Sequence, residues 1–408
     1  MIRCRFCGQP ADDVFLDLGT APPSNAFLAA SDLARPETWF PLKLHACRHC
    51  LLVQVDEVES HERLFAPDYV YYSSFSTSWL AHARRYADTV VARLSLGRGS
   101  RVVEIASNDG YLLQYLVARD IPCLGIEPTA GTAEVARARG IETIERFFGL
   151  DFASELVAQR GPADLVVGNN VLAHVPDLND FVAGVAHLLA AEGVATFEFP
   201  HLLELVRHRQ FDTVYHEHFS YFSLHVVRAV FAAHGLRVWD VEQLETHGGS
   251  LRVWACRDGA SHATQDAVPA LMAVEVAAGM TSQAFYRGFQ AVAETVKDDF
   301  LRFLLGQKQA GKHVAAYGAA AKGNTLLNFA GVRRDLLHFV VDASPHKQGR
   351  FLPGSRIPVV DESHLRDAKP DYVVVLPWNL RTEITAQLAY VREWGGRLVF
   401  AVPTLDID

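Results

Sequence analysis

The sequence predicts an α/β protein with three parts: a small zinc-binding N-terminal domain, a Rossmann-like core and a second Rossmann-like domain at the C-terminus. Two Cys-x-x-Cys pairs lie within the first 50 residues, strand-like and helix-like segments alternate from about residue 77, and a second strand–turn–helix unit begins near residue 313. Because 408 residues exceed what one hydrophobic core usually covers, several domains are expected. We place them at 1–65, 66–265 and 266–408.

The composition is that of an ordinary globular protein and restricts the partners to be expected. Half of the residues are hydrophobic, and 38 Lys and Arg stand against 47 Asp and Glu, a net charge of −9. An acidic surface disfavours nucleic acids and anionic membrane faces, which select basic patches. No apolar run reaches the roughly 20 residues of a membrane span, and no signal-peptide pattern begins the chain. A cytoplasmic protein is expected, with its oligomeric state left open.

Four of the six cysteines form two pairs with the same spacing, Cys4 with Cys7 and Cys47 with Cys50. Each Cys-x-x-Cys turn places two thiolates on one side of a metal, so two turns complete the tetrahedron that Zn²⁺ prefers. Such a zinc ion has no vacant coordination position and is therefore structural. Two unrelated, redox-active cysteine pairs are the alternative, because the loop between the pairs is longer than in a compact zinc finger.

A Rossmann-like sheet is predicted after the helical segment 78–94. A buried strand leads into the turn 107–110, which has one late glycine, and a helix is expected from Tyr111. This turn lacks the Gly-x-Gly-x-x-Gly pattern that a dinucleotide pyrophosphate requires. A second strand, 122–128, carries Glu127, which is placed to accept hydrogen bonds from both ribose hydroxyls of a bound nucleoside. The combination favours S-adenosylmethionine over a dinucleotide.

Further strands are predicted at 163–170 and 193–200, and ligands of such sheets bind at the carboxyl ends of the strands. The residues predicted to contact S-adenosylmethionine are Glu104, Ala106, Asn108, Gly110, Tyr111, Glu127, Pro128, Asn169 and Asn170.

The segment 211–222 carries Tyr215, His216, Glu217 and His218 in consecutive positions. Such side chains are costly to bury unless they pair with one another or with a ligand. Two histidines two residues apart lie on different faces of a helix, unlike the i, i+4 pair of zinc proteases, so a metal is the less favoured use. A histidine oriented by a glutamate and assisted by a tyrosine hydroxyl fits general base catalysis. A polar surface loop and a second metal site are the alternatives.

A second nucleotide-binding unit is predicted after a helical stretch at 268–309. Small residues after its first strand allow a phosphate to approach backbone N–H groups, and Lys322 adds positive charge. A nucleotide diphosphate is expected near Tyr317, Lys322 and Asn324, with Trp378 close by. The alternative is a scaffold domain with a vestigial nucleotide loop.

Several long motifs follow one another in an order that covers essentially the whole chain. They include Glu-Ile-Ala-Ser-Asn-Asp-Gly at 104–110, Tyr-His-Glu-His at 215–218, Thr-His-Gly-Gly-Ser-Leu-Arg at 246–252 and Tyr-Gly-Ala-Ala-Ala-Lys-Gly at 317–323. With these motifs the chain resembles the three-domain, S-adenosylmethionine-dependent sugar C-methyltransferases. That family joins a four-cysteine zinc domain, a methyltransferase core and a C-terminal Rossmann-like domain, and acts on nucleotide-linked 4-keto-deoxysugars.

The resemblance implies that His218 takes the proton from the carbon to be methylated. It also implies that Tyr215, Glu217 and His174 surround the keto group and the base. The residues predicted to contact the substrate are Tyr69, Tyr72, His201, His247, Tyr317, Lys322, Asn324 and Trp378.

The predicted reaction removes a proton beside the ketone and transfers a methyl group to the enolate carbon. An enolate needs a hydrogen-bond donor near its oxygen, which Tyr215 or His174 provides in this prediction. Three other functions stay open: C-methylation of a non-sugar ketone, binding of S-adenosylmethionine or a nucleotide without turnover, and an NAD-dependent epimerase or dehydrogenase. Binding alone rarely requires so many titratable groups together, which disfavours the second.

Overall fold

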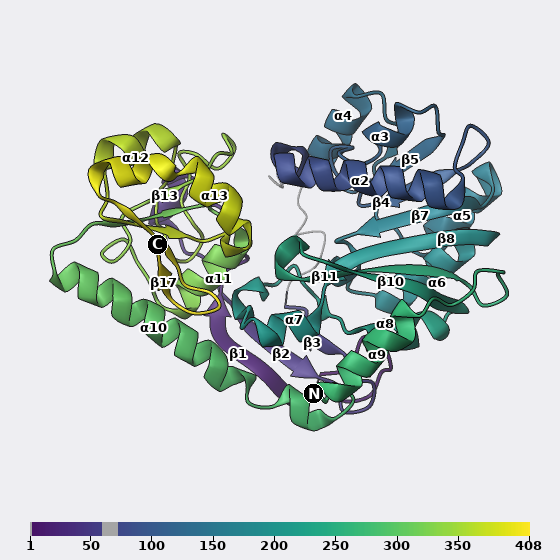
Figure 1. The fold of residues 1–408 in the computed structure, drawn as a ribbon, viewed down its shortest axis with the longest axis horizontal. Helices are drawn as coiled ribbons and strands as arrows, with labels where there is room; N and C mark the ends of the chain where they lie inside the picture. The colour runs from purple at the N-terminus through teal and green to yellow at the C-terminus, as the bar shows by residue number, and fades with distance from the viewer. Residues whose placement is uncertain (1, 59–71) are drawn as a thin grey trace.

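Three β-sheets organise the chain in the computed structural model, which describes residues 2–58 and 72–408. A seven-stranded sheet and a six-stranded sheet, each covered by helices, stand side by side, and the N-terminal strands lie beneath the junction between them (Figure 1). Among the described helices, none is both long and apolar enough to cross a membrane. The large helix α10 (Phe289–Gln309) runs beneath the six-stranded sheet and reaches the first strand of the chain (Figure 1).

The N-terminal sheet takes its fourth strand from a distant part of the chain. Strands β1 (Asp13–Ala21), β2 (Phe40–Ala46) and β3 (Val53–Val55) are antiparallel, and β3 pairs with β9 (Ser220–Tyr221). Strand β9 directly follows the predicted base, His218, so one edge of the catalytic segment is hydrogen-bonded into the zinc-binding part of the chain. Strands β1, β2 and β3 of the zinc-binding part therefore do not form a separate domain.

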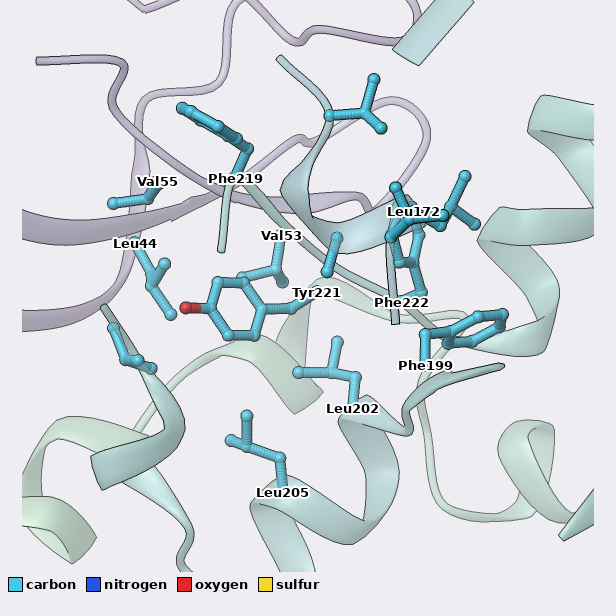
Figure 2. Close-up of a cluster of buried hydrophobic side chains, with 14 of the residues drawn as sticks. Leu44, Val53, Val55, Leu172, Phe199, Leu202, Leu205, Phe219, Tyr221 and Phe222 are labelled. Atoms are coloured by element: carbon cyan, nitrogen blue, oxygen red, sulfur yellow. The ribbon is translucent and has the colours of Figure 1, made fainter. Parts of the chain in front are cut away.

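Buried side chains make this junction continuous, as Figure 2 shows. The cluster contains residues of β2 and β3, residues of the core, and residues on both sides of β9: Leu44, Val53, Val55, Leu172, Phe199, Leu202, Leu205, Phe219, Tyr221 and Phe222. Every one of them is at most 5% exposed. Because full burial of one large apolar side chain contributes about 1.5–3 kcal/mol, the shared cluster strongly resists separation of the two parts.

The seven-stranded sheet has the predicted Rossmann-like topology. Its order is β10-β11-β8-β7-β4-β5-β6, with the last five strands parallel and β10 and β11 antiparallel. The strands are β4 (Val102–Ile105), β5 (Cys123–Ile126), β6 (Thr143–Ile144), β7 (Ala163–Asn169), β8 (Leu189–Pro200), β10 (Leu236–Leu244) and β11 (Ser250–Arg257). Strand order reverses between β4 and β7, and ligands bind at such a switch point.

Helices cover both faces of this sheet, as the near-continuous apolar runs of its parallel strands require. They are α2 (Thr77–Leu94), α3 (Gln114–Val117), α4 (Ala130–Ala138), α5 (Leu150–Arg160), α6 (Leu178–Leu188), α7 (Leu202–Arg207), α8 (Leu224–Ala232) and α9 (Ala267–Ala277). The single helical stretch predicted at 268–309 is divided into α9 and α10. The cause is local, because Gly279 and Gly288 adopt positive φ angles of 85° and 87°, which end one helix and precede the next.

The six-stranded sheet confirms the second Rossmann-like unit. Its order is β14-β13-β12-β15-β16-β17, parallel except for β17 at the edge. The elements are β12 (Val314–Tyr317), α11 (Ala321–Phe329), β13 (Val340–Val341), β14 (Val359–Val360), α12 (Glu362–Ala368), β15 (Tyr372–Val375), α13 (Arg381–Gln387), β16 (Arg397–Phe400) and β17 (Asp406–Ile407).

Glu275 of α9 is a buried link between three elements of the core. Its Oε1 accepts a hydrogen bond from the backbone N–H of Leu224 at 2.6 Å and lies 2.8 Å from His201 Nε2, while Oε2 accepts one from the N–H of His225 at 2.9 Å. The carboxylate thus satisfies donors at the N-terminus of α8, where negative charge is favoured. His201, predicted to contact substrate, is 1% exposed and faces this carboxylate.

We therefore predict that Glu275→Ala lowers the free energy of unfolding by about 3–5 kcal/mol, because it leaves buried donors without their acceptor. Glu275→Gln keeps one acceptor oxygen and should cost less. Urea unfolding followed by circular dichroism measures both variants. Glu134→Ala, at an exposed position of α4, is the control, and an equal loss for this control and for Glu275→Ala would contradict the prediction.

Candidate active site

A cavity of about 700 Å³ opens at the carboxyl ends of β4, β5 and β7. Its lining joins four parts of the chain: the strand ends of the core, Asn25 of the N-terminal part, the segment that carries His218, and loop and helix residues of the C-terminal unit, among them Lys322. One cavity therefore connects the predicted cofactor residues with the predicted base.

Seven of the nine residues predicted to contact S-adenosylmethionine line this cavity. They are Ala106, Asn108, Tyr111, Glu127, Pro128, Asn169 and Asn170. The other two lie behind it. Glu104 is 1% exposed on β4, and a Cβ at Gly110 would stand 2.3 Å from the Ile141 side chain, so this glycine permits close packing within the protein.

The turns at this edge of the sheet are conformationally strained. Ala106, Asn108 and Asn170 have φ angles of 56°, 50° and 54°, a left-handed conformation that residues with a Cβ rarely adopt. Strained backbone of this kind persists where the surrounding structure enforces it, and it is concentrated at binding sites. The strain therefore indicates that these turns are shaped for a ligand.

Glu127 connects two of these turns. Its Oε2 accepts a hydrogen bond from the N–H of Asn108 at 2.8 Å, and Oε1 accepts one from the N–H of Thr129 at 3.0 Å. The Thr129 hydroxyl also donates to Oε1. A carboxylate has about four acceptor positions, so one remains for a ribose hydroxyl. Close by, the buried Oδ1 of Asn169 has no hydrogen-bond partner among the described residues. These acceptors fit the hydroxyl and amino groups of an adenosyl ligand.

His218 has a defined tautomer. Its Nδ1 lies 3.1 Å from the carbonyl oxygen of Thr213, which only accepts, so Nδ1 carries the hydrogen. Nε2 is consequently an acceptor, and the Tyr215 hydroxyl donates to it at 2.8 Å. Burial, reinforced by the neighbouring His174, holds the pKa of His218 well below its usual value. The ring is therefore neutral at physiological pH, and its Nε2 lone pair accepts the Tyr215 hydrogen.

The glutamate of the motif does not orient this histidine. Glu217 Oε1 accepts a hydrogen bond from Asn25 Nδ2 at 3.2 Å, and burial raises the pKa of the Glu217 carboxyl. The expected orienting role belongs to the Thr213 carbonyl, because the Glu217 side chain bonds to Asn25 instead. His216 lies 3.1 Å from the carbonyl oxygen of Pro41 and anchors the segment to β2.

His174 lies beside the base, with ring centroids 4.7 Å apart. Its Nδ1 is 2.7 Å from the carbonyl oxygen of Glu217, so Nδ1 carries the hydrogen and Nε2 is an acceptor. Burial lowers the pKa of His174 to about 4, so the ring stays neutral. In this tautomer His174 has no second N–H to donate. The expectation that His174 donates to an enolate oxygen therefore disagrees with its hydrogen bonding. Of the two predicted donors, only Tyr215 keeps that role.

Two of the predicted substrate residues, Lys322 and His247, line the cavity. His247 has a φ of 56° in the turn before β11, and burial together with Lys322 lowers its pKa to about 4. The indole of Trp79, with ring centroids 5.2 Å apart, covers His247 and also lines the cavity. Trp79 belongs to no recognisable motif and was not predicted.

The remaining substrate predictions lie elsewhere. Tyr317 accepts a hydrogen bond from Gln387, Asn324 Nδ2 donates to the carbonyl oxygen of Ser24 at 2.7 Å, and His201 faces Glu275. None of these three lines the described cavity. Tyr69 lies outside the described residues.

Two aromatic residues flank the cavity without lining it. Tyr72 stacks on His346 with ring centroids 5.3 Å apart. Trp378 donates through Nε1 to Asp212 at 2.7 Å. The structure thus places both at the edge of the site.

The small-residue turn before α11 is occupied by the protein itself. The N–H of Ala319 donates to Asp342 Oδ2 at 2.7 Å, and a Cβ at Gly318 would stand 2.3 Å from Pro377. The glycine therefore permits packing, and the amide is already bonded. These contacts favour the scaffold alternative for this turn.

The four cysteines converge as predicted. Their sulfur atoms all lie within 4.8 Å of one another, with Cys4 Sγ 3.4 Å from Cys50 Sγ and Cys7 Sγ 3.5 Å from Cys47 Sγ. A tetrahedral zinc with Zn–S bonds of about 2.3 Å requires sulfur atoms roughly 3.8 Å apart. Arg5, between the first two cysteines, donates to the carbonyl oxygens of Val55 and Pro176 and so fixes the cysteine turn to the core.

Known protein families match the chain in the order of these parts. A zinc binding domain family matches residues 4–65, a methyltransferase domain family matches 79–241, and a C-methyltransferase C-terminal domain family matches 245–403. C-methyltransferase NovU of Streptomyces niveus is 38% identical over 404 residues, which is 98% of this chain and 95% of the relative. The chain belongs to the three-domain, S-adenosylmethionine-dependent C-methyltransferase family.

Solved structures resemble the core of this C-methyltransferase at low identity. Magnesium protoporphyrin IX methyltransferase from Synechocystis PCC 6803, with bound S-adenosylmethionine, is 14% identical, with a TM-score of 0.35 over 50% of this chain and 99% of that one. An S-adenosylmethionine-dependent methyltransferase from Mesorhizobium loti is 15% identical, with a TM-score of 0.35 over 44% of this chain and all of that one.

We predict about one equivalent of zinc per chain of this C-methyltransferase, because four thiolates complete one tetrahedron. Cys47→Ser should lower the zinc content of the purified protein and its melting temperature, since ligand loss opens the site. Mass spectrometry of the metal measures the first effect. Cys123→Ser, outside the cysteine quartet, should keep the zinc, and an unchanged zinc content in Cys47→Ser would contradict the assignment.

We further predict that Glu127→Ala weakens binding of S-adenosylhomocysteine by about 1–3 kcal/mol, the usual loss when hydrogen bonds to a charged group disappear. Isothermal titration calorimetry measures this without any methyl acceptor. Glu145→Ala removes an exposed carboxylate near β6 and serves as the control. Equal dissociation constants for Glu127→Ala and the wild type would show that the acid does not contact the ribose.

Proposed function

We propose that this C-methyltransferase acts on a nucleotide-linked keto-deoxysugar, methylating the carbon beside the ketone with His218 as the general base. The observation that carries the proposal is the Nε2 lone pair of a neutral histidine, held in a cavity that also contains the strand-end turns of the core. A ketone acidifies the adjacent C–H bond enough for such a base. The likeness to C-methyltransferase NovU supports carbon as the methyl acceptor.

The side chains around His218 are suited to proton removal. S-adenosylmethionine, when bound, supplies the methyl group as an electrophilic sulfonium. His218 Nε2 takes the proton, and the carbonyl of Thr213 stabilises the resulting imidazolium through its Nδ1–H. The Tyr215 O–H must leave the Nε2 lone pair as Nε2 takes the proton, so it turns to another acceptor. The enolate oxygen that forms in this step is such an acceptor. Proton uptake by His218 is thereby coupled to hydrogen-bond donation by Tyr215.

The residues that the C-terminal unit contributes to the cavity lining favour an extended, anionic substrate. Besides Lys322, the cavity is lined by Lys347 of the loop after β13 and by Asn379. Basic side chains concentrated at one end of a cavity in an otherwise acidic protein favour a phosphorylated ligand. Because the N–H of Ala319 before α11 is already bonded, we assign phosphate contacts to the side chains of Lys347 and Asn379 and not to that backbone group.

His218→Asn should reduce turnover by about 10²–10⁴-fold, the usual contribution of a positioned base, with S-adenosylhomocysteine affinity unchanged. The wild type should also exchange solvent deuterium into the carbon beside the ketone of a nucleoside-diphosphate 4-keto-6-deoxyhexose, and the variant should not. His208→Asn, at the exposed position directly after α7, is the matched control.

The low pKa of His218 adds a pH dependence to the same prediction. A base whose folded pKa is depressed stays neutral as the pH falls through 6.5, the usual value for histidine, and is protonated only below its own lower pKa. Initial rates at pH 6.5 and pH 7.5 should therefore be nearly equal. A variant His218→Asn that methylates within a few-fold of the wild type would transfer the role to another group.

A further inference from the structure

Helix α11 packs against residues 211–218, the segment that carries His218. Thr325 Oγ1 donates to the carbonyl oxygen of Val214 at 2.7 Å, and Asn324 Nδ2 donates to the carbonyl oxygen of Ser24 at 2.7 Å. Both α11 side chains are at most 2% exposed. The next residue after Ser24 is Asn25, which donates to Glu217. The helix that the sequence assigns to a nucleotide phosphate is therefore a wall of the site that holds the base.

Lys322 lies in the first turn of this helix, one turn before Thr325, and its side chain faces the cavity that His218 and Tyr215 line. Its Nζ donates to Asn379 Oδ1 at 2.8 Å and lies 4.6 Å from the centroid of the Trp378 ring. An ammonium group has three N–H bonds, so Asn379 takes only one of them. The others are available to an acceptor in the cavity.

The positive charge of Lys322 affects the pKa of two histidines that line the cavity. It contributes to the lowered pKa of His218 and of His247, after the larger effect of burial on each. Among the described residues, no carboxylate oxygen comes within 4.0 Å of Lys322 Nζ. Burial lowers the pKa of Lys322, and Asp212, held by Trp378 Nε1, opposes this shift. The lysine therefore brings a positive charge into the cavity that holds the base, without a directly bound counter-ion.

A phosphate is a poor fit for this ammonium group. In a phosphate loop, backbone N–H groups at the helix start share the anion with the lysine. Here the N–H of Ala319 donates to Asp342, and the carbonyl oxygen of Ala319 accepts from Lys347 at 2.9 Å. Lys322 instead donates to Asn379 and lines the cavity that His218 also lines, where proton removal from a ketone creates negative charge on oxygen.

We propose that Lys322 is a catalytic residue whose ammonium group donates to the ketone oxygen and stabilises the enolate. His218 Nε2 takes the proton, the C–H electron pair becomes the C=C bond, and the C=O π pair moves to the oxygen that faces Lys322. The enolate carbon then forms the new C–C bond, while the S–CH₃ electron pair remains on sulfur. This role rests on the proposed ketone chemistry.

The test uses the full-length, zinc-containing enzyme with a nucleoside-diphosphate 4-keto-6-deoxyhexose. Lys322→Gln should lower both deuterium exchange beside the ketone and the kcat of methylation by about 10²–10³-fold, the usual loss for one oxyanion donor. KM and the dissociation constants for S-adenosylhomocysteine and for the free nucleoside diphosphate should change less than threefold. Lys322→Arg, which keeps the charge, should recover part of the exchange rate and remains testable should the glutamine variant fail to fold. Lys312→Gln, an exposed lysine of the same domain, is the control.

The alternatives give different results. A raised KM and nucleoside-diphosphate dissociation constant with unchanged kcat would assign Lys322 to the phosphates and overturn the proposal. A covalent adduct on Lys322 after borohydride reduction in the presence of the ketone would replace the ammonium role with an imine and overturn it too. Unchanged deuterium exchange in both Lys322→Gln and Lys322→Arg would overturn the role of Lys322 and leave the proposed function of the enzyme intact. No exchange and no methylation by the wild type would overturn the keto-sugar function together with this role.

Discussion

Burial of one polar segment is the constraint on which the rest of this structure depends. Residues 211–218 carry a base, two acids and two further titratable groups in an apolar environment, where each unpaired polar group costs several kcal/mol. No single domain supplies the partners. They come from all three parts of the chain: Pro41 and Asn25 of the N-terminal part, His174 of the core, and Thr325 and Trp378 of the C-terminal unit. The three parts are therefore held together by the need to satisfy this segment.

The zinc-binding part acts on the reaction at a distance. Four thiolates fix the ends of β2 and the turn before β1, and β3 then pairs with β9, which follows the base by two residues. The metal has no open coordination position and takes no part in proton transfer. Its effect is mechanical, because the shared apolar cluster and the β3–β9 pairing leave the backbone of the base little freedom to move.

Features encoded by neighbouring residues could be predicted from the sequence, and features that depend on docking could not. Glu127 and Asn169 were placed correctly at the cavity because a strand end is a local property and parallel strands share one edge. Asn324 was assigned to a ligand because the pattern of a helix start does not reveal which neighbour covers it. Trp79 was missed for the converse reason, since it reaches the cavity from a helix with no motif.

The pairing of β3 with β9 also has a consequence for how the protein is made. The cysteine-rich strands leave the ribosome first, yet the edge they need is encoded at Ser220 and Tyr221, far along the message. Domains generally fold as units in the order of synthesis. Here the first unit keeps an unpaired strand edge until the core has emerged, and such an edge is a template for wrong partners. Early capture of zinc would shorten that exposure by making the nascent strands compact, so metal supply during translation is expected to govern the yield of native protein.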